Sequence, residues 1–200
     1  MSISFNDAAY LLSAPNLKHC PPDEGIEIAF AGRSNAGKSS AINTLTKNNK
    51  LARTSKTPGR TQLINFFTLN ENKRLVDLPG YGFAKVPIAV KNKWQAMMTG
   101  YLENRDSLKA VVVVMDSRHP LKDIDKQMIE WADFNGLKTL ALLTKSDKLS
   151  KNEANKTLFA VKKHLKDYPN AHCQLFSSLK KTGLEELKAT LSEWYNEESP

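Results

Sequence analysis

The chain has 200 residues, of which 29 are Lys or Arg and 21 are Asp or Glu, so its formal net charge is +8. With 40% hydrophobic and 25% charged residues, the composition is that of a globular protein and excludes a disordered or fibrous chain. The longest apolar run, Ala110 to Met115, is far shorter than the roughly 18 to 20 residues that cross a bilayer. Residues 1–12 also lack the basic region of a secretory signal. We therefore expect a cytoplasmic protein without a membrane segment.

Strand-like and helix-like segments alternate along the chain after a short arm at residues 1–23. Strands are predicted at residues 26–31, 63–69, 74–78, 110–116, 139–144 and 172–177. Helices are predicted at residues 39–46, 90–104, 123–135, 151–166 and 184–195. No repeat or linker divides residues 24–200, so we expect one α/β domain there. Its six-stranded sheet should be mostly parallel, with helices on both faces and one antiparallel strand at residues 63–69.

The first strand leads into a glycine-rich loop that matches G-x-x-x-x-G-K-[ST]. Such a loop turns its backbone N–H groups toward phosphates, and the next helix adds its positive N-terminal end. Lys38 is expected to reach the β- and γ-phosphates, and the Ser39 hydroxyl to bind Mg²⁺. A glycine-rich turn before an ordinary helix is the alternative. The expected nucleotide-binding residues here are Gly32, Arg33, Ser34, Asn35, Ala36, Gly37, Lys38, Ser39 and Ser40.

A polar stretch, Thr57-Pro58-Gly59-Arg60-Thr61, follows the first helix. It lies where a switch loop that orders around the γ-phosphate is expected, although an ordinary Pro-Gly turn is compatible with the same residues. Two threonines compete for the role of a Mg²⁺ ligand. Gly59, Arg60 and Thr61 are candidate nucleotide-binding residues.

Asp77-Leu78-Pro79-Gly80 comes at the end of the strand at residues 74–78. A carboxylate at Asp77 can reach the Mg²⁺ shell through water, and the Gly80 N–H can approach the γ-phosphate closely because no side chain blocks it. Taken alone, a D-x-x-G sequence is more often a turn. Its place after the phosphate loop makes all four residues candidates for the nucleotide site.

Thr144-Lys145-Ser146-Asp147 ends the strand at residues 139–144 and resembles the [NT]-K-x-D element that reads guanine. The Asp147 carboxylate can accept hydrogen bonds from guanine N1–H and the 2-amino group, a donor pair that adenine lacks. Lys145 can lay its aliphatic stem along the base. An exposed polar loop is the alternative, and the phosphate loop argues against it.

Ser177-Ser178-Leu179 closes the last predicted strand and is similar to a loop whose backbone N–H groups contact guanine O6. Ser-Ser turns are frequent, and Leu179 departs from the usual Lys. This assignment therefore depends on the order of the motifs along the chain.

Taken together, the motifs from Gly32 to Leu179 resemble those of the EngB family of GTPases, in the TrmE-Era-EngA-like class. The resemblance covers nearly the whole chain. It implies a three-layer, Ras-like P-loop GTPase domain that hydrolyses GTP during assembly of the bacterial large ribosomal subunit, and so supports growth, division and septation. It also favours Thr61 over Thr57 as the Mg²⁺ ligand of the switch loop.

The resemblance identifies Lys38, Thr61 and Asn35 as candidate catalytic residues. Tyr81 occupies the position after Gly80 where signalling GTPases carry a glutamine that orients water, so slow intrinsic hydrolysis is predicted. In related GTPases an asparagine at the place of Asn35 helps to hold K⁺ beside the phosphates, which makes K⁺ a candidate cofactor with Mg²⁺. The alternative is that Asn35 only caps the loop.

Basic residues gather around the expected switch regions. The stretch from residue 47 to residue 74 has a local net charge of +6, and residues 78–102 contain no acid. An anionic surface such as ribosomal RNA is therefore an expected partner, bound through phosphates and shape, although a solvated basic loop has the same composition. The basic residues are Lys47, Lys50, Arg53, Lys56, Arg60, Lys73, Arg74, Lys85, Lys91 and Lys93.

Two other classes of protein remain to be weighed. A P-loop kinase or ATPase would share the phosphate loop, but the element at residues 144–147 argues against it. A protein that holds GTP or GDP without useful turnover would share every motif. We expect a monomer that does not associate with membranes.

Overall fold

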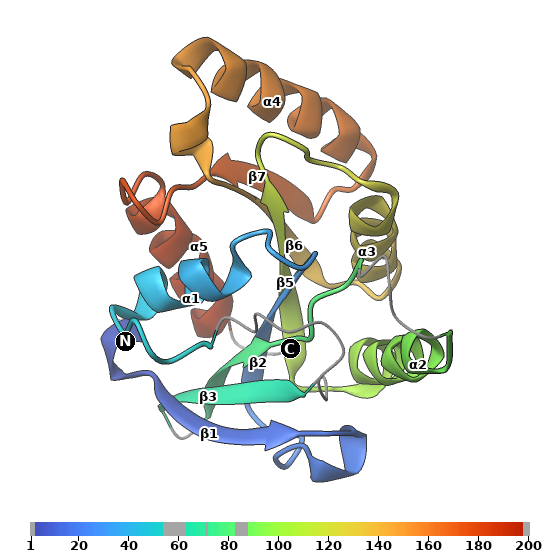
Figure 1. The fold of residues 1–200 in the computed structure, drawn as a ribbon. Coiled ribbons are helices and arrows are strands. Elements are labelled where there is room, and N and C mark those ends of the chain that lie inside the picture. Colours follow the sequence, from blue (N-terminus) through green and yellow to red (C-terminus); the bar gives the residue numbers. More distant parts are fainter. Residues whose placement is uncertain (1–2, 54–62, 71, 83–87, 198–200) are drawn as a thin grey trace.

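A seven-stranded sheet forms the middle layer of the molecule in the computed structural model, which describes residues 3–53, 63–70, 72–82 and 88–197 (Figure 1). The strand order is β1-β3-β4-β2-β5-β6-β7, and β3 runs antiparallel to both of its neighbours. All other pairs are parallel. The strands are β1 (Ala9–Ala14), β2 (Ile26–Gly32), β3 (Ile64–Asn70), β4 (Lys73–Asp77), β5 (Leu108–Asp116), β6 (Lys138–Thr144) and β7 (Ala171–Leu175).

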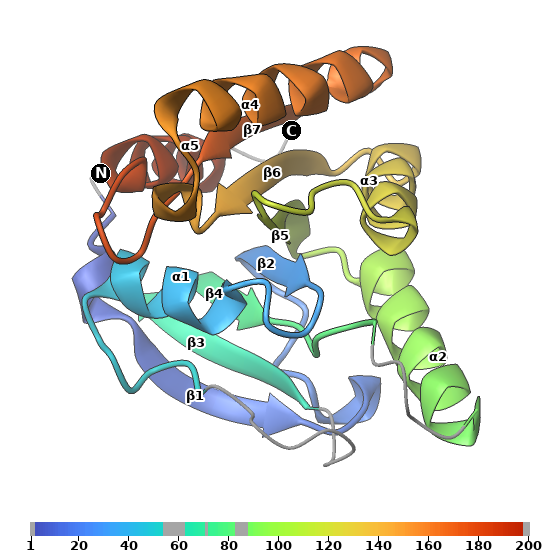
Figure 2. The same ribbon diagram turned by 45° about the horizontal axis from the view of Figure 1, so that its top comes forward.

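Helices cover both faces of this sheet, as Figure 2 shows. One face carries α1 and α5, and the other carries α2, α3 and α4. The helices are α1 (Lys38–Thr46), α2 (Ile88–Asn104), α3 (Asp123–Phe134), α4 (Lys151–His164) and α5 (Leu184–Asn196). No helix in the described part of the chain is long and apolar enough to cross a membrane. The predicted three-layer α/β fold is confirmed.

The central strands are apolar at nearly every position because both of their faces are buried. In β2, Ile28 and Phe30 pack with the α1 and α5 layer, whereas Ala29 and Ala31 pack with the other layer. The residues of β5 alternate in the same way. This two-sided burial holds β2, β5 and β6 in register, so their carboxyl ends meet at one edge of the sheet.

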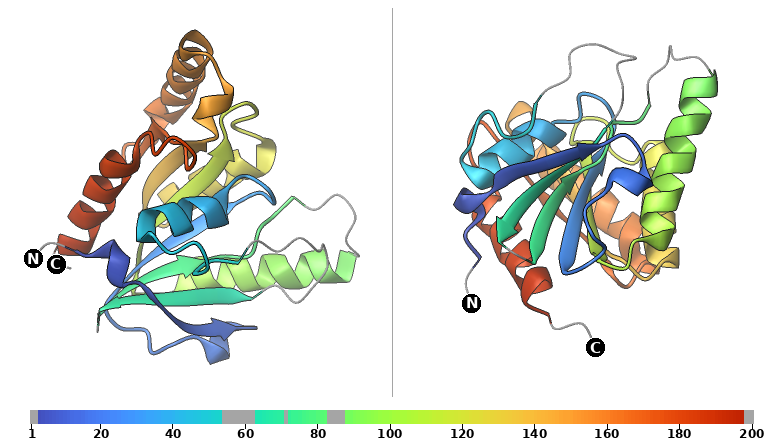
Figure 3. Two further views of the ribbon diagram at one scale, coloured as in Figure 1. Left: turned by 60° about the vertical axis from the view of Figure 1, so that its left-hand side comes forward. Right: turned by 90° about the horizontal axis from the view of Figure 1, so that it is seen from below.

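The sheet has seven strands where six were predicted, because β1 was assigned to the N-terminal arm. β1 pairs antiparallel with β3 at the edge of the sheet (Figure 3). Its first three residues, Ala9 to Leu11, are exposed, so it lacks the apolar pattern of the central strands. The division into an arm at residues 1–23 and a domain at residues 24–200 stays a prediction, but residues 9–14 belong to the sheet.

The predicted helices agree with the observed ones to within two residues at every end, and half of the ends coincide. α1 begins at Lys38 rather than Ser39, and α4 ends at His164, where a 3-10 turn at Leu165–Asp167 replaces its last predicted residues. The last strand begins at Ala171 and ends at Leu175, two residues before the predicted end. These shifts leave the motifs that begin at residues 32, 77, 144 and 177 at or just after the carboxyl end of a strand.

Candidate guanine nucleotide site

The phosphate loop joins the carboxyl end of β2 to the first turn of α1. Gly37, immediately before the helix, has a φ of 95°, and a Cβ there would lie 3.2 Å from the Thr144 hydroxyl oxygen. Glycine is favoured by both the left-handed backbone and this close approach. Ala41 N–H donates to the Gly37 carbonyl in the first hydrogen bond of the helix. The N–H groups before Ala41 therefore have no partner within the helix. The loop therefore has the form of an anion-binding helix terminus.

Lys38 and Asp77 form an ion pair beside this loop, and both side chains are largely buried. The pair brings the phosphate loop and the D-x-x-G motif together. The Ser39 hydroxyl donates to the Arg53 carbonyl across 3.3 Å. Mg²⁺ prefers oxygen ligands, so the Asp77 carboxylate and the Ser39 hydroxyl suit it chemically. The octahedron of Mg²⁺ is usually completed by waters and substrate phosphates rather than by a cage of protein ligands.

Thr144 and Lys145 fix the β6–α4 loop to the phosphate loop. The Thr144 hydroxyl lies within hydrogen-bond distance of the carbonyl oxygens of Ala36 and Met115, the second across 3.1 Å, and it donates its one proton to Ala36, the nearer of the two. Lys145 has a φ of 57°, and its ammonium donates to the Asn35 carbonyl across 2.7 Å. The element expected to read the base is therefore attached directly to the element expected to hold the phosphates.

Asp147 lies beside Ser177 from the β7–α5 loop. The Ser177 hydroxyl, which is 0% exposed, donates to Asp147 Oδ1 across 2.6 Å and accepts from Lys180 N–H across 3.0 Å. The Ser146 N–H donates to the Phe176 carbonyl, so the two loops are also joined through their backbones. The structure thus brings the motifs at residues 144–147 and 177–179 together. Leu179 is 73% exposed, and only its backbone is expected to contact a base.

Asp116, at the end of β5, lies beside Lys145, although no role was predicted for it from the sequence. Its carboxylate accepts two hydrogen bonds from the Arg118 guanidinium and lies 3.1 Å from the Lys145 ammonium. Burial acts to raise the pKa of Asp116, but the bonds from Arg118 and the charge of Lys145 outweigh it and hold the pKa well below the ordinary value. Its place at the carboxyl end of a predicted central strand was the signal that could have identified it.

Tyr81 packs in the core under α2, α3 and α4, whereas α1 packs on the other face of the sheet. Its hydroxyl donates to Asp125 Oδ1 across 2.8 Å, and both side chains are buried, with 2% and 1% exposed. Burial, together with the negative charge of Asp125, raises the pKa of Tyr81 well above its ordinary value. The hydroxyl therefore stays protonated, and its proton is donated to Asp125. This agrees with the inference that Tyr81 cannot replace a glutamine that orients water.

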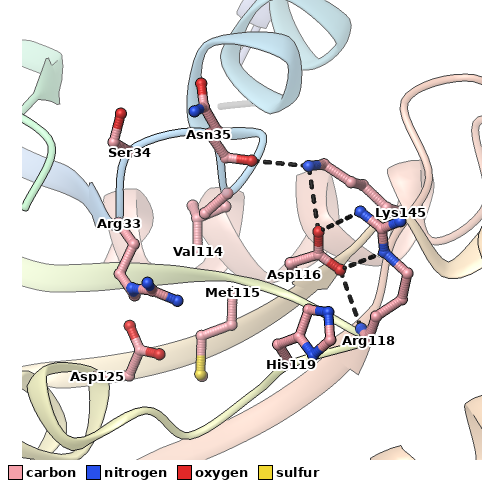
Figure 4. A pocket seen from close by; sticks show the side chains of 11 residues that line it. Arg33, Ser34, Asn35, Val114, Met115, Asp116, Arg118, His119, Asp125 and Lys145 are labelled. Atoms are coloured by element: carbon pink, nitrogen blue, oxygen red, sulfur yellow. Dashed lines mark hydrogen bonds and ion pairs between the residues drawn. The ribbon is translucent and has the colours of Figure 1, made fainter. Parts of the chain in front are cut away.

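A pocket of about 260 Å³ lies between the phosphate loop, the end of β5 and the start of α3. Figure 4 shows Arg33 and Asp125 on one side of it, and Arg118 with His119 on the other. The Asn35 side chain is exposed and points away from the pocket. None of the four histidines was given a role from the sequence, so His119 at this pocket was missed.

Part of the expected site falls outside the described residues. The stretch from Thr57 to Thr61, with Gly59 and Arg60, lies in residues 54–62, and Lys56 and Lys85 also lie outside. The prediction that Arg74 belongs to an RNA-binding surface is wrong. Arg74 is buried, and its Nε–H donates to the Glu27 carboxylate across 2.9 Å, so it cannot face a partner. Lys47, Lys50, Arg53, Lys91 and Lys93 are exposed.

Comparison with known proteins decides the family. Residues 27–145 match the family model described as 50S ribosome-binding GTPase. The chain is 57% identical over 196 residues to the probable GTP-binding protein EngB of Coxiella burnetii, covering 98% of this chain and 96% of the relative. It is 55% identical over 195 residues to the protein of that name from Aeromonas salmonicida, covering 97% and 90%. The chain belongs to the EngB family. It is therefore a GTPase.

Solved structures share the fold of this EngB-family GTPase. The crystal structure of a probable GTP-binding protein EngB superimposes with a TM-score of 0.69 at 24% identity, over 86% of this chain and 100% of the other. Era in complex with MgGDPNP and part of 16S ribosomal RNA superimposes with a TM-score of 0.64 at 19% identity, over 88% and 59%. The fold and the family predicted from the sequence motifs are both confirmed.

Proposed function

We propose that this GTPase is a GTP-dependent switch in assembly of the bacterial large ribosomal subunit, acting as a cytoplasmic monomer on which growth, cell division and septation depend. The observation that carries the proposal is the joining of three loops: Lys145 bonds to Asn35, and Ser177 bonds to Asp147. A guanine base and a phosphate chain can thus be held by one connected set of residues. The family description, 50S ribosome-binding GTPase, supports the large subunit as partner.

In this proposal the phosphates lie against the backbone N–H groups at residues 33–39 and the positive end of α1. A phosphate chain carries more negative charge than one carboxylate, so Lys38 moves its contact from Asp77 to the phosphates when nucleotide binds. Asp77 then becomes available to the Mg²⁺ shell through water, with Ser39 and Thr61 as direct ligands. When bound, Mg²⁺ supplies positive charge that offsets the charge on the phosphates.

Guanine is read by the Asp147 carboxylate, which Ser177 holds in place, with the backbone at residues 177–179 near O6. Lys145 and Thr144 keep this reader at a fixed distance from the phosphate loop through their bonds to Asn35 and Ala36. Because Tyr81 is occupied by Asp125, hydrolysis lacks a side chain at that position to orient water and is slow without a partner.

The RNA contact is proposed for the exposed lysines of residues 47–50 and of the first half of α2, together with the basic residues between β3 and α1 that lie outside the described range. Such binding should depend on phosphates and weaken steeply with salt. Era, which shares the fold, has been crystallised with ribosomal RNA and MgGDPNP, which supports this kind of partner.

Co-sedimentation with purified large ribosomal subunits tests the proposal. The protein is mixed with subunits at moderate salt in the presence of a non-hydrolysable GTP analogue, GDP or no nucleotide. Pelleting with the analogue alone supports a nucleotide-gated assembly factor. Equal pelleting in all three states, or none, contradicts it and leaves a guanine nucleotide binder. Addition of subunits should also accelerate GTP hydrolysis.

A further inference from the structure

The backbone that follows the D-x-x-G motif is bonded to the phosphate loop. Tyr81 N–H donates to the Gly32 carbonyl across 3.1 Å, and Ser34 N–H donates to the Tyr81 carbonyl across 2.9 Å. Arg33 and Tyr81 thereby form an isolated parallel bridge. Gly80 lies between this bridge and the end of β4, and a Cβ built on it would be 3.5 Å from the Ser34 nitrogen. The position of Gly80 is therefore set by where Tyr81 is held.

The Tyr81 side chain contacts one residue of α3 and one residue of α2. Its hydroxyl bonds to Asp125, and its ring packs edge-on against Trp94 with the ring centroids 6.0 Å apart. A buried tyrosine whose hydroxyl is bonded to a carboxylate has one favourable orientation, because any other leaves two buried polar groups without partners. The ring therefore transmits the position of α3 to the backbone at Gly80.

Asp125 itself has little freedom to move. It lies in the first turn of α3, where its second carboxylate oxygen accepts from Lys122 N–H across 3.1 Å. One oxygen thus caps the helix, and the other holds Tyr81. Burial raises the pKa of Asp125, and the bonds from Tyr81 and Lys122 lower it in part. Each oxygen of the Asp125 carboxyl group therefore accepts one hydrogen bond, Oδ1 from Tyr81 and Oδ2 from Lys122.

We infer that Asp125 is a positioning residue of the GTPase site, which acts through Tyr81 to hold the Gly80 N–H in place for the γ-phosphate. Within the described residues, the Gly80 N–H donates a hydrogen bond to no other group, so it is available to a ligand. The inference rests on the proposed role of Gly80. It predicts that breaking the bond between Tyr81 and Asp125 weakens GTP binding selectively, because GDP has no γ-phosphate for Gly80 to contact.

The first test is Tyr81→Phe, which removes only the hydroxyl. Affinities for GDP and for a non-hydrolysable GTP analogue are measured by fluorescence of labelled nucleotides. We expect the analogue to bind about five- to tenfold more weakly, the size of one ordinary hydrogen bond, while GDP affinity changes less than about twofold. In steady-state hydrolysis, KM for GTP should rise and kcat should also fall.

A matched control is Tyr195→Phe. The Tyr195 hydroxyl is equally buried and donates to the Arg74 carbonyl across 2.6 Å, at the other end of the sheet. Both variants lose one buried hydrogen bond, so both should be less stable to denaturant. Only Tyr81→Phe should change the ratio of analogue affinity to GDP affinity. An equal effect of the two variants on that ratio would overturn the inference.

Asp125→Ala tests the partner of the Tyr81 hydroxyl. The change removes the acceptor of that hydroxyl, so its effect on the affinity ratio should match that of Tyr81→Phe. In the double variant the effects should not multiply, because both changes break one bond. A multiplied effect would show that Asp125 acts independently of Tyr81.

Gly80→Ala separates failure of this inference from failure of the proposed site. The added methyl makes only ordinary contacts, at 3.5 Å or more, so the variant should fold. If Gly80→Ala lowers the affinity for the GTP analogue and Tyr81→Phe does not, the inference is wrong and the role of Gly80 stands. If neither variant changes the affinity ratio, the inference about Asp125 and the proposed role of Gly80 are both wrong.

Discussion

The Ser177 hydroxyl donates to the Asp147 carboxylate across 2.6 Å and joins two loops whose residues are 30 positions apart in the chain. Ser177→Ala should weaken GTP and GDP binding together by about tenfold, because the carboxylate loses a charge-assisted hydrogen bond that orients it toward the base. Equilibrium binding of labelled GTP and GDP measures this. Ser178→Ala is the matched control, and affinities for Ser177→Ala within about twofold of the original would contradict the assignment.

Asp147→Asn should change which base the protein prefers. The amide offers an N–H donor where the carboxylate offered an acceptor, so the 2-amino group of guanine loses its partner, whereas the 2-oxo group of xanthine gains one. We expect GTP affinity to fall by about 100-fold and xanthosine triphosphate to become the better ligand. Competition between the two nucleotides measures the change. Equal losses for both nucleotides would mean that Asp147 supports the loop without reading the base.

The hypothesis of K⁺ as a cofactor depends on Asn35, whose side chain is exposed on the phosphate loop. If K⁺ is held there beside the phosphates, GTP hydrolysis should be faster in K⁺ than in Na⁺ buffer, and Asn35→Ala should remove the difference. The Asn35 carbonyl bonds to Lys145 and is retained in the variant, so the loop should keep its shape. The hypothesis fails if turnover is the same in both buffers.

The pKa of Asp116 is lowered in the folded protein, so its ionised form stabilises the fold. This contribution is fully present above the ordinary pKa of 3.8 and is lost as the pH falls below that value. Asp116→Asn should therefore lower the free energy of unfolding at pH 7 and reduce its loss between pH 5 and pH 3. Denaturant unfolding across this range measures both effects. Asp167→Asn, which removes one exposed negative charge, is the matched control.

The sequence predicted the fold well wherever periodicity was strong. The central strands are buried on both faces and therefore apolar throughout, whereas β1 is an edge strand with an exposed start, and its pattern was too weak to read. Each motif of the expected nucleotide site could be predicted from a short stretch of sequence, because its residue types and spacing suit one kind of ligand.

Contacts between loops could not be predicted in the same way. The bonds from Lys145 to Asn35 and from Tyr81 to Asp125 join residues 110 and 44 positions apart. They depend on how the strands are ordered in the sheet, which no local pattern encodes. Asp125 in particular reads as an ordinary acidic residue in the first turn of a helix.

Glu27, at the start of β2, is 0% exposed and is surrounded by donors from three parts of the chain. Its carboxylate accepts from Arg74 Nε across 2.9 Å, from an Arg105 nitrogen across 2.7 Å and from the Tyr101 hydroxyl across 2.7 Å. Glu27→Gln leaves two guanidinium groups facing a neutral amide, so the free energy of unfolding should fall by about 3 kcal/mol. Chemical denaturation measures the loss, with exposed Glu24→Gln as control.

Nucleotide affinity should not change in Glu27→Gln, because Glu27 lies near the amino end of β2 and the phosphate loop follows its carboxyl end. The two readouts together distinguish a structural network from a part of the site. A variant as stable as the original protein would show that the network contributes little net energy. A variant with normal stability but weaker GTP binding would instead mean that this end of β2 is coupled to the phosphate loop through the strand.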